Sequence, residues 1–577
     1  MNMIKQGGRF LWRLPEYDTQ QVEAIALKYN VSFAVAQVLS NRGFQIGNQL
    51  EQFLFGTIDK QKINAVGMKD IEKAVDRIMA AIQNREKILI CGDYDVDGIT
   101  SSALMMICLL PLGAQVNFFI PHRVKDGYGL STKVVERAAA NNYRVMITVD
   151  NGITAFEPAQ KARALGVDLI ITDHHKPHDH VPDAFAIINP HQKDCDYPFK
   201  YFAGVGVTFK IMALLYERLQ KALPTKAYEL MLFGTVADVV PLVDENRLWV
   251  KHGLHYVNHA HESFSLSVLK CNGKIDKPHL TSTDIGFFIA PQINALGRLE
   301  DPRCGVQFLI GQDKGQVEEV GRLLLELNEK RKAIEKKIVQ SIQDQVEKGD
   351  IDVTKNRVII ASSASWPPGV IGLVASRIVG LYGRPTILLH ETSSGLLKGS
   401  CRSIKEFNMF QALESAADLL QQFGGHAQAA GLSLHKNQLD AFKKRLEARA
   451  AELLTEFDLQ QKITIDAHLQ MTDLTKKIVN DLALLEPFGN ENDAPVFLLE
   501  GVTLIQMPQL LKDLHVKCIM FKDGIIKPVM FFNRPELFDF LIDAREKSFS
   551  IVARISQNFW QSRVNIELIG IDIIVEG

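Results

Sequence analysis

Cysteine is sparse in this 577-residue chain, and its spacing excludes two common kinds of site. The seven cysteines form no C-x-x-C pair, so a zinc ribbon is not indicated, and their odd number argues against a disulfide framework. Low-complexity tracts and repeats of fixed period are also absent from the sequence. We therefore expect reduced thiols, as in a cytoplasmic protein.

Long apolar runs are lacking as well. The N-terminal stretch MNMIKQGGRFLWRLPEYD has no apolar core of the kind that a signal peptide needs. The most apolar run, residues 103–114, is interrupted by Pro111 and is shorter than the ~20 residues of a membrane-spanning helix. The sequence thus predicts a cytoplasmic protein with no membrane partner.

Neither sign of charge is in excess. The 65 basic and 67 acidic residues give a net charge of −2, so any contact with nucleic acid depends on a local positive surface. A content of 46% hydrophobic and 23% charged residues is typical of globular proteins. A chain of this length exceeds one hydrophobic core, which predicts about three or four folded domains.

The pattern along the chain predicts a multidomain α/β protein. Short Val/Ile-rich strands alternate with helices from about Ile71 onward, which is typical of a parallel sheet covered on both faces. A further helix is predicted over 209–221. A long amphipathic helix follows, then a second α/β unit, and from about Gln461 come short β-rich runs typical of a small barrel. The predicted parts are a helical leader (1–65), a parallel-sheet domain (66–310), a connecting helix (311–350), a second α/β domain (351–458) and a β-barrel (459–577).

The segment CGDYDVDG places three acids where a ligand site is expected. Asp93, Asp95 and Asp97 follow a short apolar strand and precede a helix. In an open α/β sheet, ligands bind at such turns, at the carboxyl ends of the strands. Because neighbouring carboxylates repel one another, the segment predicts a bound hard cation such as Mg²⁺ or Mn²⁺.

Two other interpretations of this segment are less favourable. It matches the start of an EF-hand calcium loop, but the twelfth position, where that loop needs glutamate, is Leu104, and a strand rather than a helix precedes it. A solvated acidic turn without a role is the other alternative. The metal site is the preferred prediction.

Further acids and histidines end the later strands of the same domain. Asp150 ends one strand, Asp173, His174 and His175 end the next, and Asp238 follows in GTVADVVPL. Singly, Asp150 could shape a turn and Asp238 could cap a helix, but together at one sheet edge they predict a two-metal phosphoesterase site. Asp173 could bind metal or orient a ligating histidine.

The motifs GDYDVDG, VDNG, TDHHKP and GTVADVVPL resemble, in order, the four motifs of the DHH phosphoesterase superfamily. Beyond them, WRLPEYD, LSNRG, NALGRLEDP, KGSCRSI, FGGHAQAAGL and PFGNENDAPVF resemble one branch, the bacterial 5′→3′ exonucleases specific for single-stranded DNA. The resemblance covers nearly the whole chain. It implies a DHH domain, a DHH-associated domain and a C-terminal OB-fold.

The resemblance also implies roles for the strand-end residues. His175 is placed nearest the scissile phosphate as a hydrogen-bond donor or proton carrier, and Asp150 is catalytic as well as metal-binding. Asp93 binds metal directly or through water. The expected cofactors are two Mn²⁺ or Mg²⁺ ions, and the implied ligands are Asp93, Asp95, Asp97, Asp150, His174 and Asp238.

Substrate contacts are implied in the same way. The residues that match those holding a 5′-terminal phosphate are Arg123, Arg298, Ser400 and Arg402. Arginine suits a phosphate because its guanidinium donates two parallel hydrogen bonds. His426 matches a residue that faces the metal cleft. The implied partners are single-stranded DNA with a 5′ end, a single-strand-binding protein and a helicase. The expected state is a monomer that acts in DNA repair and recombination.

The terminal β unit offers candidate stacking aromatics, Phe531, Phe532, Phe559 and Trp560, among basic residues. They could equally form barrel core, and strand alternation turns one of Phe531 and Phe532 inward. The chain departs from the family pattern at Cys401, Glu491 and Asp493, and at Pro367, where histidine is common. We expect Cys401 to crowd the phosphate pocket slightly.

Two rival functions were considered. Another DHH phosphoesterase activity, on short oligonucleotides, cyclic dinucleotides or polyphosphate, is disfavoured because a small substrate needs no OB-like region. A non-catalytic scaffold with a degenerate site is disfavoured because every acidic motif is intact.

Overall fold

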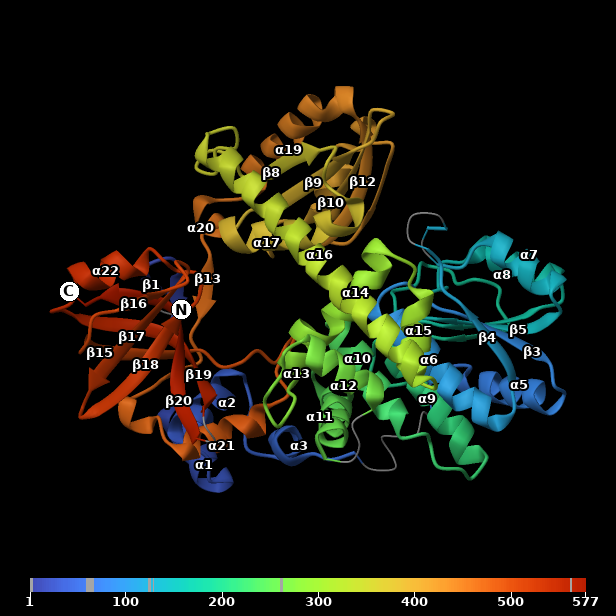
Figure 1. Ribbon diagram of the computed structural model, residues 1–577, viewed down its shortest axis with the longest axis horizontal. Helices are drawn as coiled ribbons and strands as arrows, with labels where there is room; N and C mark the ends of the chain where they lie inside the picture. Colours follow the sequence, from blue (N-terminus) through green and yellow to red (C-terminus); the bar gives the residue numbers. More distant parts are fainter. Residues whose placement is uncertain are drawn as a thin grey trace. The chain divides into compact units, whose positions relative to one another are not determined.

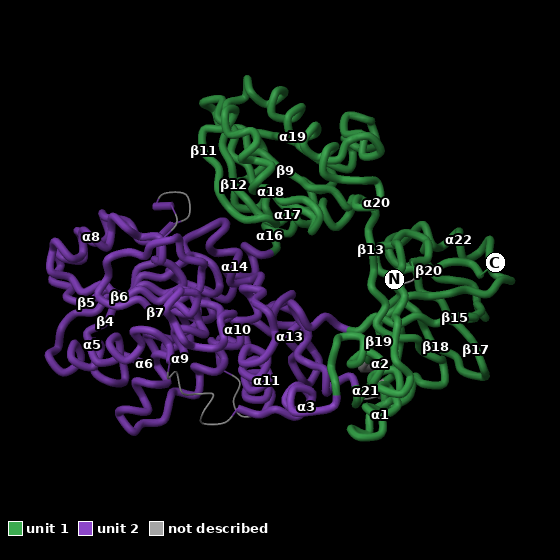
Figure 2. Tube along the Cα trace, turned by 180° about the vertical axis from the view of Figure 1, so that it is seen from behind, with its two compact units in different colours: residues 1–45, 329–481, 495–577 green, residues 46–328, 482–494 purple. Residues whose placement is uncertain are grey.

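The computed structural model describes residues 4–58, 67–122, 126–127, 129–259, 263–560 and 563–576. Its contacts divide the chain into two compact units, shown in Figure 2. Unit 1 comprises residues 1–45, 329–481 and 495–577, and unit 2 comprises residues 46–328 and 482–494. Each unit is therefore assembled from segments that are distant in sequence.

Unit 2 contains a five-stranded parallel sheet in the order β4-β3-β5-β6-β7, which lies among α5 (Ile71–Gln83), α7 (Thr132–Ala140) and α8 (Phe156–Ala164) in Figure 1. The predicted parallel sheet is confirmed. Its strands are β3 (Lys87–Cys91), β4 (Gln115–Phe119), β5 (Tyr143–Val149), β6 (Asp168–Thr172) and β7 (Ala186–Ile188).

Both faces of this sheet are buried, which explains why its strands are apolar throughout. In β3, Ile88 and Ile90 belong to one core cluster, whereas Leu89 and Cys91 belong to a second cluster on the opposite face. The first cluster includes residues of α5, α6 (Val96–Leu109) and α9 (Gly204–Arg218); the second includes residues of α7 and α8.

The winding direction of the sheet reverses beside β3. The next strand in sequence, β4, lies on one side of β3, and β5 lies on the other. The direction of winding thus reverses between β3 and β5, and ligands bind outside the carboxyl ends of the strands at such a switch point. The turn that carries Asp93, Asp95 and Asp97 starts at this end of β3.

Helices complete unit 2 and connect it to the second α/β region. The 34-residue helix α16 (Lys314–Glu347) confirms the predicted connecting helix. The other helices are α3 (Asn48–Phe55), α10 (Lys226–Ala237), α11 (Asp244–His259), α12 (Phe264–Asn272), α13 (Ser282–Asp284), the π-helix η2 (Ile285–Ile289), α14 (Ala290–Leu299) and α15 (Arg303–Ile310).

The second α/β region has a mixed sheet in the order β11-β12-β10-β9-β8, in which only β8 and β9 are parallel. Its strands are β8 (Ile359–Ser363), β9 (Thr386–Glu391), β10 (Leu396–Arg402), β11 (Gln422–Gly425) and β12 (Ala429–His435). Its main helices are α17 (Pro368–Tyr382), α18 (Met409–Glu414) and α19 (Leu439–Leu453).

The C-terminal region is a seven-stranded sheet that curls back on itself, because β15 pairs with both β19 and β17. This partly closed ring agrees with the predicted barrel. Its elements are β14 (Ala467–His468), α21 (Lys476–Leu485), β15 (Phe497–Leu504), β16 (Gln509–Leu511), β17 (His515–Lys522), β18 (Ile525–Phe531), α22 (Leu537–Asp543), β19 (Ser548–Trp560) and β20 (Arg563–Val575).

The two neighbouring phenylalanines of this ring point in opposite directions, as strand alternation predicts. Phe531 is fully buried, whereas Phe532 is 50% exposed. Phe532 therefore remains a candidate for stacking on a base, and Phe531 is core. The side chains of Phe559 and Trp560 lie outside the described part of the chain.

The N-terminal leader is not purely helical. Its helices α1 (Thr19–Tyr29) and α2 (Phe33–Asn41) are preceded by the strands β1 (Ile4–Gln6) and β2 (Leu11–Arg13). β2 pairs with β1 and also with β13 (Lys462–Thr464). The strands were missed because β2 finds its second partner far away in sequence.

A buried carboxylate ties this leader to the last strand. Asp572 is fully buried and accepts hydrogen bonds from the backbone N–H of Arg9 (3.0 Å), the backbone N–H of Phe10 (3.1 Å) and the Trp12 indole Nε1 (2.8 Å). Because buried N–H groups need acceptors, this one side chain fixes the path of the N-terminal segment.

We expect Asp572→Ala to lower the free energy of unfolding of unit 1 by about 2–3 kcal/mol. The buried Trp12 indole loses its acceptor, and a buried, unsatisfied donor costs about 1–3 kcal/mol, whereas the N–H groups of Arg9 and Phe10 are partly accessible to water. Urea titration followed by tryptophan fluorescence measures this. The exposed carboxylate Asp543 provides the control, and its alanine variant should unfold like the parent. Equal midpoints for both variants would contradict the role given to Asp572.

Among the described residues, no single helix is long and apolar enough to cross a membrane; α1 and α2 reach that length and composition only as a pair bent by 119°.

Candidate metal centre

The turn after β3 carries three aspartates close together, Asp93, Asp95 and Asp97. Asp95 caps α6 by accepting a hydrogen bond from the Gly98 N–H at 3.1 Å, and Asp97 lies in the first helical turn. Gly98 packs against the backbone of Asp93, where an added Cβ would lie 2.5 Å from the Asp93 nitrogen. Asp93 and Asp97 are buried and Asp95 is half-buried. The glycine therefore allows three carboxylates to crowd into one turn.

The start of α9 holds Asp97 in place. Asp97 Oδ2 accepts from the Gly204 N–H at 2.6 Å, and its Oδ1 accepts from the Val205 N–H at 2.8 Å. The N-terminus of a helix favours such an anion. Burial and the charge of Asp95 nevertheless raise the pKa of Asp97 to about 7, although the two N–H groups oppose this.

Asp150 packs against the same helix start. Its backbone has a positive φ of 62°, and its N–H donates to the Thr172 carbonyl at 3.1 Å. A Cβ added to Gly204 would lie 2.5 Å from the Asp150 Cβ, so residue 204 must be glycine for Asp150 to keep this position. Burial, followed by the charges of Asp97 and its acidic neighbours, raises the pKa of Asp150 well above its usual range.

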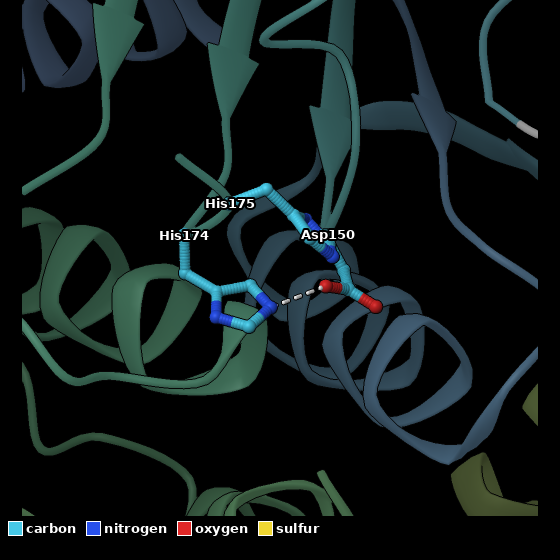
Figure 3. Close-up of side chains that lie close together, drawn as sticks. All are labelled: Asp150, His174 and His175. Carbon is cyan, nitrogen blue, oxygen red and sulfur yellow. Dashed lines mark ion pairs between the residues drawn. The ribbon is translucent and has the colours of Figure 1, made fainter. Parts of the chain in front are cut away.

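His174 faces three of the carboxylates. Its Nε2 lies 3.1 Å from Asp150 Oδ1 (Figure 3). The same atom lies 3.6 Å from Asp238 Oδ2 and 3.8 Å from Asp97 Oδ2. Burial, and secondarily the charge of His175, lowers the pKa of His174 to about 3, so the imidazole is neutral. Asp150 Oδ1 and His174 Nε2 are shielded from solvent, and neither hydrogen-bonds to any described residue.

These residues meet the requirements of a metal site. Three overlapping groups each bring three ligand atoms within 4.8 Å of one another: Asp93–Asp95–Asp150, Asp97–His174–Asp238 and Asp150–His174–His175. Carboxylate oxygens with a neutral imidazole suit Mn²⁺ and also accept Mg²⁺. The raised pKa values of Asp97, Asp150 and Asp238 and the two unsatisfied buried atoms fit a site for divalent cations. We call Asp93, Asp95, Asp97, Asp150, His174 and Asp238 the Asp–His cluster.

Asp173 lies behind the cluster and orients the histidines. Its Oδ1 accepts from the backbone N–H groups of His174 (2.7 Å) and His175 (3.1 Å) and lies 2.7 Å from the His175 Nδ1. Its Oδ2 accepts from the Ile153 N–H at 2.9 Å. Although burial opposes it, these bonds lower the pKa of Asp173. Of its two predicted roles, the geometry favours orientation over metal binding.

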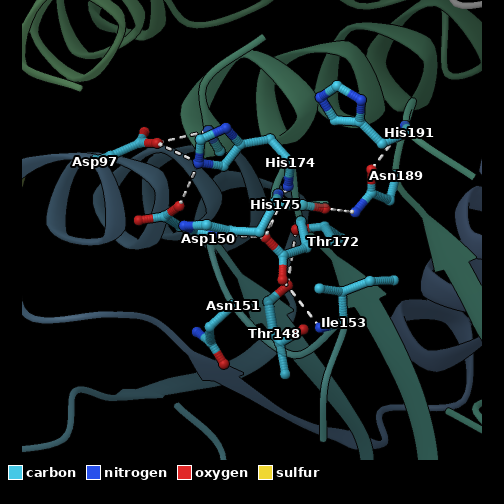
Figure 4. A network of polar contacts seen from close by, with 12 residues as sticks. Asp97, Thr148, Asp150, Asn151, Ile153, Thr172, His174, His175, Asn189 and His191 are labelled. Carbon is cyan, nitrogen blue, oxygen red and sulfur yellow. Dashed lines mark hydrogen bonds and ion pairs between the residues drawn. The ribbon is translucent and has the colours of Figure 1, made fainter. Parts of the chain in front are cut away.

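His175 is the protonated member of the site. Burial lowers its pKa, but the hydrogen bond with Asp173 and the surrounding carboxylates outweigh this effect and raise the pKa to about 9. Its side chain is 44% exposed, so its Nε2 can reach a bound substrate. Asn189 Nδ2 donates to the His175 carbonyl at 2.8 Å and further fixes the backbone of His175 (Figure 4).

We expect Asp173→Asn to lower kcat by ~10–100-fold while leaving cation binding near the parent value, because the amide offers one acceptor oxygen instead of two and no charge to hold His175 protonated. Steady-state kinetics and Mn²⁺ titration separate the two effects. A variant that loses its cations would show instead that Asp173 is itself a ligand.

The predicted phosphate-binding residues lie in both units. In unit 2, Arg298 is half-buried near the end of α14, and its neighbour Gly297 packs on the carbonyl of Tyr94, between Asp93 and Asp95. Arg298 is thus close to the Asp–His cluster. Arg123 lies outside the described residues.

In unit 1, Ser400 and Arg402 lie together at the end of β10. Arg402 Nη1 donates to the Ser400 Oγ at 3.2 Å, and a Cβ on Gly372, in the second turn of α17, would lie 2.8 Å from that Oγ. The pair therefore faces the first turns of α17. His426 is exposed, just after β11.

The expectation for Cys401 is wrong. Between Ser400 and Arg402, its side chain points to the opposite face of β10, where it is fully buried in the hydrophobic core. Alternation along a strand requires this, so Cys401 fills core and does not crowd the pocket.

Gly204 was not singled out from sequence. The helix predicted over 209–221 begins earlier, at Gly204, and this first turn makes the contacts to Asp97 and Asp150. The signal available was the segment AGVGV, in which glycines just before an apolar helix indicate close packing.

Comparison with known proteins adds family relationships to this geometry. Residues 87–235 match the DHH family, N-terminal domain; residues 355–452 match the DHHA1 domain; and residues 465–572 match the RecJ OB domain. The Asp–His cluster lies in the first match, except for Asp238 just beyond it.

Curated relatives match over most of the chain. The single-stranded-DNA-specific exonuclease RecJ of Bacillus subtilis is 36% identical over 560 residues, covering 96% of this chain and 70% of the relative. The Escherichia coli exonuclease of the same name is 33% identical over 505 residues, covering 84% and 86%. The crystal structure of Thermus thermophilus RecJ in complex with Mn²⁺ superposes with a TM-score of 0.81 and 27% identity, covering 98% of this chain and 79% of that one.

Proposed function

Since the chain belongs to the RecJ family of single-stranded-DNA-specific exonucleases, we propose that the Asp–His cluster is its catalytic centre. The chain is a metal-dependent exonuclease that hydrolyses single-stranded DNA in the 5′→3′ direction and releases 5′-mononucleotides, acting in DNA repair and recombination. Its cofactors are Mn²⁺ or Mg²⁺, as its oxygen and imidazole donors require.

One observation carries this proposal. The His174 Nε2 faces carboxylates from three separate elements, all buried or half-buried, and finds no hydrogen-bond partner among the described residues. When bound, two divalent cations would activate the attacking water and neutralise charge on the phosphoryl oxygens. Asp95, Asp97, Asp150, His174 and Asp238 would hold them, and Asp93 would bind directly or through water.

His175 has the properties of a catalytic hydrogen-bond donor. It is protonated through Asp173, partly exposed, and adjacent to the metal-binding His174. In this role it donates a hydrogen bond from Nε2 to a phosphate oxygen as negative charge develops there. Asp173 keeps the ring oriented, which is why it is a positioning residue.

Selection of the 5′ end would rest on cationic and hydroxyl groups. Arg298 lies next to the acidic turn, and Ser400 and Arg402 lie side by side at the end of β10, where they face α17. We assign phosphate contacts to Arg123 and Arg298 in unit 2 and, separately, to Ser400 and Arg402 in unit 1, and a substrate contact to His426.

We propose that the enzyme is a cytoplasmic monomer with five parts. These are an N-terminal leader (1–65), a DHH domain (66–310), a connecting helix (311–350), a DHH-associated domain (351–458) and an OB-fold domain (459–577). A helicase would supply the single strand, and a single-strand-binding protein would keep it open. Gel filtration and pull-down with each partner test these statements.

Digestion of strands labelled separately at each end tests the function. With Mn²⁺, a 5′-labelled strand should release labelled mononucleotide at once, a 3′-labelled strand should shorten progressively, and EDTA should stop both. Faster cleavage of a dinucleotide than of a long strand would favour a small-substrate phosphodiesterase. Intact strands would favour a scaffold.

A further inference from the structure

The residue that follows Asp238 has a strained backbone. α10 ends at Ala237, Asp238 keeps a helical conformation, and Val239 then adopts a left-handed φ of 59°. A β-branched residue in this region is an outlier that persists only where its surroundings impose it. The Val239 side chain is 63% exposed, so core packing does not hold it.

Asn490 supplies the missing constraint. Its side-chain Nδ2 donates to the Val239 carbonyl at 2.9 Å, and its backbone carbonyl accepts from the Leu242 N–H, also at 2.9 Å. The same residue thus bridges both ends of the loop that follows Asp238. All of these residues belong to unit 2.

The segment around Asn490 is anchored independently of that side chain. Asn492 Nδ2 donates to the carbonyls of Leu485 (2.9 Å) and Pro487 (2.8 Å), and the Phe488 carbonyl accepts from the Ser282 hydroxyl at 2.6 Å. Gly489 packs so closely on Leu242 that a Cβ would lie 2.6 Å from its Cδ1. Removing the Asn490 amide therefore leaves the segment in place and releases only Val239.

We propose that Asn490 is a positioning residue that holds Asp238 in its metal-binding orientation through the Val239 carbonyl. The inference rests on the proposed function of the Asp–His cluster. It makes the short segment between α21 and β15 part of the support of the metal centre, although that segment is more than 240 residues away in sequence.

Mn²⁺ binding without DNA, measured by titration calorimetry and by the EPR signal of free Mn²⁺, tests the proposal. We expect Asn490→Ala to weaken one of two Mn²⁺ sites by ~3–10-fold, which corresponds to losing one hydrogen bond, and to raise the Mn²⁺ concentration at half-maximal rate by a similar factor. Asn490→Asp should weaken it too, because the carboxylate has no N–H to donate, even though its charge alone would favour a cation. The KM for DNA at saturating Mn²⁺ should stay unchanged.

Asn141→Ala is the matched control. In the parent, the side-chain amide of Asn141 is also exposed and donates to a backbone carbonyl, that of Arg137. Asn141 lies at the opposite end of β5 from the Asp–His cluster. This variant should bind Mn²⁺ like the parent, and thermal unfolding should show that both variants are folded. Equal Mn²⁺ binding by Asn490→Ala and the parent overturns the inference, as does tighter binding by Asn490→Asp. Failure of the parent itself to bind Mn²⁺ overturns the proposed function instead.

Discussion

Asp150→Ala is expected to lower exonuclease activity by ~10³-fold or more and to abolish binding of at least one Mn²⁺ ion. Asp150 belongs to two of the three candidate ligand groups, so its loss affects both cation positions. Cation stabilisation of a phosphoryl transition state is worth several kcal/mol, and each ~1.4 kcal/mol changes the rate about tenfold. Release of mononucleotides from a labelled strand, beside Mn²⁺ titration, measures both losses.

The same experiment needs a carboxylate that lies outside the cluster. Asp179 follows β6 on the same chain segment as His174, and its side chain is fully exposed. Asp179→Ala should cleave DNA at the parent rate. If Asp150→Ala still degraded DNA at more than a tenth of that rate, the Asp–His cluster would not be the catalytic centre.

Gly204→Ala is expected to have the second-largest effect, a loss of ~10²-fold in kcat, although residue 204 contacts no substrate. The new Cβ would lie 2.5 Å from the Asp150 Cβ and 2.8 Å from its Cα, so α9 and Asp150 must move apart. That movement also lengthens the bonds from the Gly204 and Val205 N–H groups to Asp97. A displacement of about 1 Å at a catalytic site costs on the order of 10²-fold in rate.

Gly380→Ala separates this effect from a general effect of glycine replacement. Gly380 lies inside α17, and nothing is within 4 Å of its added Cβ. Alanine in such a helical position should raise stability slightly and leave cleavage unchanged. Should Gly204→Ala cleave DNA normally, the close contact between α9 and Asp150 would have no bearing on catalysis.

The parts that the sequence predicted well depend on local patterns. Near-continuous apolar strands indicated a sheet buried on both faces, and the acids that end β3, β5 and β6 were brought together because parallel strands end at one edge. Asp238 joined them only through its motif, since the end of α10 has no such geometric rule. Family resemblance supplied direction of cleavage and substrate, which no spacing reveals.

The parts that were missed depend on contacts between distant segments. The sequence around Trp12 gives no indication that Asp572 accepts its indole hydrogen bond. Likewise, the sequence around Val239 does not indicate that Asn490 donates a hydrogen bond to its carbonyl. Gly204 was overlooked because only its close contact with Asp150, a residue distant in sequence, requires a glycine there. Cys401 was misjudged because neighbours in a strand face opposite sides.

The pairing of the N-terminal strands has a consequence for synthesis on the ribosome. Trp12 leaves the ribosome 560 residues before Asp572, and β2 precedes its partner β13 by almost as long an interval. At ~5–20 residues per second, this delay is roughly half a minute to two minutes. During that time the edge of β2 that later pairs with β13 has no partner strand, and an unpaired edge favours association between chains. This segment of the nascent chain is therefore open to aggregation until β13 is made, and slower translation of the C-terminal region should lower the yield of folded protein.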